Sequence, residues 1–114
     1  MMDKRGTFLC VIYALIAVAA LISTWSQNLA FMALPDNGGT AGFIRAAFVN
    51  PAAASLGYDI LFFALAAFVW MVVEAQRLGL RFVWLYIVLS CLIAVSVIFP
   101  LFLIARQRRL ARLA

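Results

Sequence analysis

Residues that could carry chemistry are scarce in this chain. Its 114 residues include four carboxylates, two cysteines and no histidine. Two of the carboxylates, Asp59 and Glu74, stand in apolar surroundings, and Glu74 follows Asp59 by fifteen residues. That spacing is about 22 Å along a helix, too far for the two groups to act as acid and base on one small substrate. The sequence therefore predicts no catalytic pair.

The two cysteines, Cys10 and Cys91, also lie within apolar stretches. A free cysteine in such a place commonly acts as a small apolar packing residue, and we assign both to packing. The chain has no histidine, no paired cysteines and no cluster of carboxylates, so it offers no predicted metal or haem site. We therefore predict no cofactor.

The elements that must position these residues are three apolar segments. Hydrophobic residues make up 68% of the chain and charged residues 11%, well below the roughly 25% of a soluble domain. Segments 7–26, 56–75 and 82–105 each have roughly the 20 residues that a helix needs to cross about 30 Å of hydrocarbon. The sequence predicts an all-α fold, in which residues 1–114 form one integral membrane domain, a three-helix bundle with a basic tail at 106–114.

The connections between the segments carry their own signals. Residues 35–40 combine proline, aspartate, asparagine and two glycines, which is turn chemistry. Residues 42–49 predict a short interfacial helix, which is either a functional interfacial or re-entrant segment or a plain connector that rests on the bundle. Asn50 and Pro51 form a good N-cap and first helical residue, so the second helix can begin at 51. Pro100 removes a backbone hydrogen bond and predicts a kink late in the third segment.

Asp59 is the residue with the strongest claim to function, because a carboxylate within a membrane segment is a functional candidate by default. Three interpretations stay open. A structural ion pair with Arg45 would neutralise both groups and fix the connector to the second helix. Alternatively, Asp59 is simply exposed at the interface, or it serves a substrate or a proton in a polar site shared with Arg45 and Asn50.

Charged and aromatic residues near the segment ends indicate how the chain contacts the membrane surface. Glu74 and Arg77, at i,i+3, predict an interfacial surface pair, and Trp25 predicts an anchor at headgroup level. The net charge of +5 comes from basic residues at segment ends, which favours anionic lipid headgroups over nucleic acid as a partner. With three spans the basic residues divide almost evenly between the two sides. The positive-inside rule then leaves the orientation undecided.

From Asn50 onward the sequence has a familiar pattern. It runs Asn50-Pro51, Asp59, Val73-Glu74-Ala75-Gln76-Arg77-Leu78-Gly79, Trp84-Leu85-Tyr86 and Phe99-Pro100-Leu101-Phe102-Leu103. Over about the last two thirds of the chain this resembles the small bacterial membrane family called domain of unknown function 2834, DUF2834. The resemblance implies a multi-pass protein of the bacterial inner membrane and carries no assigned activity.

Asp59 and Pro100 also carry a more remote similarity, to the membrane family implicated in neoxanthin formation. The chain lacks the additional span, the histidine and the second inward aspartate of that family.

Three functions fit these observations. The first is a non-enzymatic accessory subunit, or a homo-oligomer, which short loops and small residues for helix packing favour. The alternative is a membrane enzyme or carrier for an isoprenoid or carotenoid-like lipid, with Arg45, Asn50 and Asp59 at the mouth of the bundle. The third is an oligomeric transporter, although the segments show no polar stripe.

Overall fold

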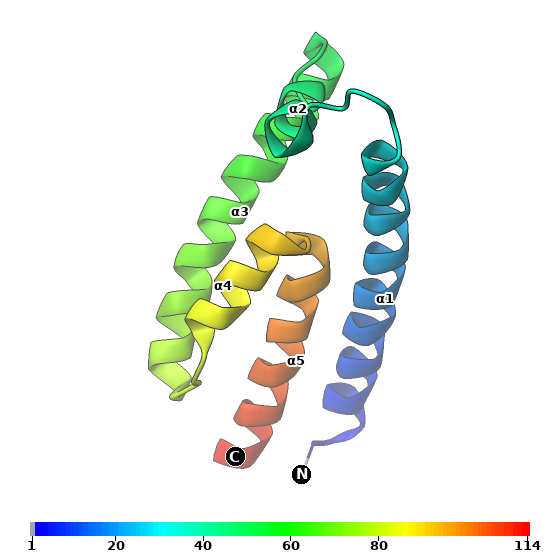
Figure 1. Ribbon diagram of the computed structural model, residues 1–114. Coiled ribbons are helices and arrows are strands. Elements are labelled where there is room, and N and C mark those ends of the chain that lie inside the picture. Colours follow the sequence, from blue (N-terminus) through cyan, green and yellow to red (C-terminus); the bar gives the residue numbers. More distant parts are fainter. Residues whose placement is uncertain (1) are drawn as a thin grey trace.

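The computed structural model describes residues 2–114, and the regular elements in this part of the chain are all helices. In order they are α1 (Lys4–Met32), α2 (Gly39–Ala46), α3 (Pro51–Leu78), α4 (Val83–Leu92) and α5 (Val95–Leu113) (Figure 1). The all-α fold class is confirmed. α1 and α3 are each long and apolar enough to cross a membrane, which favours membrane association.

The two long helices begin at side-chain caps. The Asp3 carboxylate accepts a hydrogen bond from the Gly6 amide at 2.7 Å, at the start of α1. The Asn50 side chain accepts one from the Ala53 amide at 2.8 Å, so α3 begins at Pro51, the earlier of the two starts that the sequence allowed. Such caps satisfy backbone N–H groups that have no partner within the helix.

The third apolar segment is not one helix, which corrects the prediction for 82–105. α4 ends at Leu92, and the backbone at Ala94 is extended, with φ −179° and ψ 140°. α5 then runs back beside α4, so that the two form a helical hairpin (Figure 1). As a result both termini lie at the same end of the molecule.

The chain reversal between α4 and α5 contains no helix-breaking residue. Neither glycine nor proline stands at 92–95, and α5 continues through Pro100 without ending there. Long-range contacts hold the reversal instead. Arg106 bonds Glu74 on α3. In a continuous helix Arg106 would lie about 34 Å from Val83, at the opposite end from Glu74.

α5 occupies the centre of the fold. It packs against α1 on one side and against α3 and α4 on the other (Figure 1). Phe102 of α5 and Met71 of α3 are fully buried. The Phe102 ring meets Trp70 of α3 and Tyr86 of α4 edge to face, with centroids 6.0 and 5.5 Å away. This aromatic cluster joins α3, α4 and α5.

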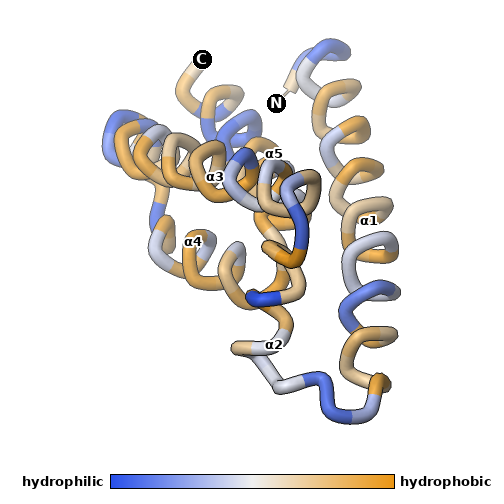
Figure 2. The backbone as a smooth tube through the Cα atoms, turned by 90° about the horizontal axis from the view of Figure 1, so that it is seen from above, coloured by the Kyte–Doolittle hydropathy of each residue, from blue (hydrophilic) through white to orange (hydrophobic). Residues whose placement is uncertain are grey.

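The connection between α1 and α3 lies at the end opposite the termini. Hydrophilic residues gather near both ends of α1 and in the loop before α2 (Figure 2). Gly42 allows α2 to sit close to this loop, because a Cβ there would overlap the carbonyl oxygen of Asn37. α2 thereby forms one wall of a cavity.

Candidate functional site

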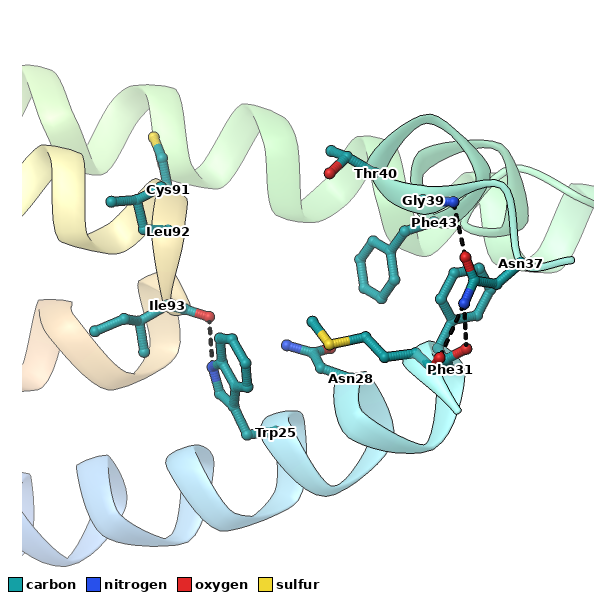
Figure 3. A pocket seen from close by; sticks show the side chains of 11 residues that line it. Trp25, Asn28, Phe31, Asn37, Gly39, Thr40, Phe43, Cys91, Leu92 and Ile93 are labelled. Atoms are coloured by element: carbon teal, nitrogen blue, oxygen red, sulfur yellow. Dashed lines mark hydrogen bonds between the residues drawn. The ribbon is translucent and has the colours of Figure 1, made fainter. Parts of the chain in front are cut away.

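A cavity of about 370 Å³ lies between α1, α2 and the turn of the α4–α5 hairpin (Figure 3). Its volume falls within the roughly 300–1,000 Å³ range of small-molecule sites. The main lining residues are Trp25, Asn28 and Phe31 from α1, Thr40 and Phe43 from α2, and Leu92 and Ile93 from the hairpin turn. None of the described residues that line it is charged.

Trp25 ties α1 to the hairpin turn that forms the floor of the cavity. Its indole Nε1–H donates a hydrogen bond of 3.0 Å to the carbonyl oxygen of Ile93 (Figure 3). Ile93 is the C-cap of α4, where carbonyl groups lose their helical partners. Trp25, predicted as a headgroup anchor, therefore satisfies a backbone group left open by the chain reversal.

Asn37 holds the opposite wall. Its side-chain amide N–H groups donate to the carbonyls of Met32, the last residue of α1, at 3.0 Å and of Leu34, just beyond it, at 3.1 Å. Its side-chain oxygen accepts from the Gly39 amide at 2.8 Å, at the start of α2. One side chain thus joins the end of α1 to the beginning of α2, and both of its amide N–H groups are used within the protein.

Asn28 and Thr40 are the polar side chains of the cavity that remain available. Among the described residues, no hydrogen bond joins the Asn28 amide or the Thr40 hydroxyl to another group. Asn28 projects into the space between Trp25 and Phe43 (Figure 3). The cavity therefore presents an amide and a hydroxyl among aromatic walls.

A second polar cluster lies at the end that holds the termini. Glu74 is buried, with 7% of its side chain exposed, and its two carboxylate oxygens accept from Arg77 at 2.6 Å and Arg106 at 2.5 Å. The Arg106 guanidinium also lies 5.4 Å from the centre of the Trp70 ring, in cation–π geometry. Arg109 donates to the Leu78 carbonyl at 2.7 Å, at the end of α3. These contacts bind α5 to α3.

This end is strongly basic as a whole. Eight of the nine basic residues lie here, namely Lys4, Arg5, Arg77, Arg81, Arg106, Arg108, Arg109 and Arg112. The remaining one, Arg45, lies on α2 at the other end (Figure 1). The near-even division expected from three spans is thus replaced by a segregation of charge, because the hairpin returns the basic tail to the end that holds Lys4.

The structure does not bring the predicted polar site together. Arg45 and Asp59 are both exposed, and no ion pair joins them within residues 2–114. Asn50 uses its side chain to cap α3. Among the described residues no group of three or more carboxylates, thiols or imidazoles lies together as metal ligands. Glu74, not Asp59, is the carboxylate that is buried and held by ion pairs.

Sequence reasoning missed three residues that matter here. Arg106 was assigned only to the basic tail, since its approach to Glu74 requires the chain reversal. Asn28 and Thr40 are single polar residues with no motif around them. An asparagine four residues before the end of a long apolar helix was the one visible signal for the cavity.

The Trp25 hydrogen bond leads to a first prediction. We expect Trp25→Phe to destabilise the fold by about 1–2 kcal/mol, because the Ile93 carbonyl loses its donor in a mostly apolar setting. The thermal midpoint in detergent measures this loss. Trp84→Phe is the control, since Trp84 is 68% exposed. Equal midpoints for the two variants would show that the bond does not support the hairpin turn.

Fold and site together define a small all-helical protein with two candidate membrane-spanning helices, a helical hairpin packed against them and a cavity at the hairpin turn. The model of the family described as "Protein of unknown function DUF2834" matches residues 12–108. The chain belongs to this family. No curated protein and no solved structure matches the chain.

Proposed function

We propose that this chain is a multi-pass protein of the inner membrane, in which α1 and α3 span the bilayer and the α4–α5 hairpin is re-entrant. α4 has 10 residues, which is about 15 Å and half of a hydrocarbon layer of about 30 Å. The apolar part of α5, from Val95 to Ala105, has a similar length. The hairpin therefore enters the bilayer and returns to the same side.

The segregation of basic residues is the main support for an orientation. Cytoplasmic ends of membrane proteins carry an excess of lysine and arginine. Eight basic residues at one end against one at the other favour an arrangement with both termini in the cytoplasm. The loop before α2 then faces the opposite side. Asp59, exposed on α3, would lie near the headgroups of that opposite side.

Cysteine labelling tests this topology. In a Cys10→Ser, Cys91→Ser background, we expect Asp36→Cys to react with a membrane-impermeant maleimide in intact cells. Lys4→Cys and Arg112→Cys should react only after permeabilisation, because both lie at the basic end. A continuous third span would instead place positions 4 and 112 on opposite sides. The reverse pattern at all three positions would overturn the orientation alone.

We further propose that the chain acts as a non-enzymatic component, assembled with copies of itself or with other membrane proteins. Large apolar side chains along α1 and α3 point outward; examples are Leu15 at 65%, Ile22 at 66%, Phe62 at 63% and Val69 at 66% exposed. In lipid, helices associate through packing rather than through water exclusion, and such faces are available to partner helices.

Purification in mild detergent tests the assembly. We expect the tagged protein to co-purify in fixed ratio with untagged copies or with one membrane partner, identified by mass spectrometry and by mass measurement of the complex. A strictly monomeric protein without a stoichiometric partner would contradict the assembly. That result would leave the labelled topology unaffected.

A further inference from the structure

We infer that the cavity at the hairpin turn binds an uncharged amphipathic lipid of the diacylglycerol type. The inference rests on the proposed membrane insertion but not on its direction. Asn28 and Thr40 would hydrogen-bond the hydroxyl and ester oxygens of the ligand. The aromatic walls and the hairpin turn would hold the upper part of its chains.

The position of the cavity suits a molecule at the membrane boundary. Asn28 lies four residues before the end of α1 and about one helical turn beyond Trp25, which bonds the hairpin turn. The cavity therefore extends from the hairpin turn, within the bilayer, toward the headgroup level on the side opposite the basic end. A strongly polar, water-soluble ligand would lose its hydration in this cavity, because most of the lining side chains are aromatic or aliphatic. A wholly apolar one would leave the amide unpaired.

The two polar side chains give the cavity its preference for a hydrogen-bonding ligand. The Asn28 amide can donate and accept, and the Thr40 hydroxyl can do both as well. Neither has a partner within the described residues, whereas the N–H groups of the Asn37 amide beside them are used within the protein. Asn28 is half-buried and Thr40 is exposed at the rim of the cavity, so a hydroxyl or ester ligand that enters the cavity can reach both side chains.

The charge of the ligand follows from the lining. No described lining residue carries a charge, and α2's basic residue, Arg45, does not line the cavity. An anionic headgroup would therefore lose its hydration without gaining a counter-charge. The same argument applies to a cationic one. The basic end of the molecule attracts anionic lipids, and the cavity end selects neutral ones.

The aromatic walls supply the apolar part of the site. Phe31 and Phe43 meet edge to face with their ring centroids 5.3 Å apart, and they link α1 to α2 across the cavity. Trp25 closes the side next to the hairpin turn (Figure 3). These rings offer large, rigid contact surfaces to an apolar chain at little entropic cost.

Photolabelling in proteoliposomes tests the inference. The probe is a diacylglycerol with a diazirine near the carbonyl end of one acyl chain, compared with a phosphatidylglycerol that has the same chains. Labelling within residues 25–43 is normalised to labelling of the outward face of α3. We expect the neutral probe to exceed the anionic one by about fivefold, because the uncharged lining offers no counter-charge to the phosphate for the hydration it would lose.

Two matched variants on α1 identify the residue responsible. Asn28→Leu should lower neutral-probe labelling by about fivefold, because the amide is lost at nearly constant volume. Gln27→Leu removes the neighbouring amide, which does not line the cavity, and should leave labelling unchanged. Thr40→Val provides a second test from α2, should Asn28→Leu fail to fold.

The labelling results distinguish failure of the lipid site from failure of membrane insertion. Equal labelling by both probes, or equal labelling of 25–43 and of the α3 face, would overturn the inference. An equal response of Asn28→Leu and Gln27→Leu would do the same for the role of Asn28. Flotation of the proteoliposomes is measured first, because protein that fails to float would contradict membrane insertion itself. An inverted topology would leave labelling in symmetric liposomes unchanged.

Discussion

Glu74→Gln is expected to lower the free energy of unfolding by about 2 kcal/mol, because two hydrogen bonds to a buried carboxylate lose their charge assistance. Glu74 is the acceptor for both Arg77 and Arg106, and 7% of its side chain is exposed. The exchange keeps the volume of the side chain and removes its charge. Thermal unfolding in detergent, followed by tryptophan fluorescence, measures the change.

The two arginines should not contribute equally to this loss. The Arg77 side chain is 57% exposed, and surface pairs contribute little. The Arg106 side chain is 27% exposed and links α5 to α3. We therefore expect Arg106→Gln to be clearly more damaging than Arg77→Gln. Asp59→Asn serves as the control carboxylate, since Asp59 is exposed; a similar loss there would show that the Glu74 effect is not specific to its ion pairs.

Phe102→Ala is expected to cost on the order of 3 kcal/mol and to release the hairpin from α3. Phe102 is fully buried where α3, α4 and α5 meet, and its ring contacts Trp70 and Tyr86. The loss of contacts and the residual cavity both act here. In the proposed membrane-inserted state lipid tails replace water around the molecule, which places the value at the lower end of the range known for water-soluble cores.

Trypsin sensitivity of the link between α3 and α4 gives a second measurement for Phe102→Ala. Arg81 lies in this link, and cleavage there should accelerate when the hairpin loosens. Phe62→Ala is the control, because Phe62 is 63% exposed on the outward face of α3. If both alanine variants unfold at the same temperature, the aromatic cluster does not hold the hairpin.

Local signals in the sequence were sufficient for the parts of the fold that depend on neighbouring residues. Asn50 and Pro51 mark the start of α3, and Gly79, with φ 68°, ends it in the left-handed region that glycine favours. The apolar lengths identify α1 and α3 as candidate spans. These features are set within one or two helical turns, so a single sequence contains them.

The hairpin, the cavity and the contact between Glu74 and Arg106 could not be predicted in the same way. The residues at 92–95 have no breaker, and the reversal depends on Trp25 and Glu74, which lie 68 and 32 residues from their partners. A connector folded back against the start of the second helix suggested Arg45 as the partner of Asp59. Tertiary packing decided otherwise, because the partner of Glu74 came from a segment assumed to leave by the opposite side.

The hairpin also imposes an order on biosynthesis. Arg106 is added 32 residues after Glu74, and a chain made from the N-terminus has α3 before it has the helix that completes the ion-pair cluster. Until then Glu74 has Arg77 as its nearby cation, and the space beside α1 and α3 is open to lipid. In the proposed membrane topology, the two long helices are therefore made first, and the hairpin packs between them only after α5 has been added.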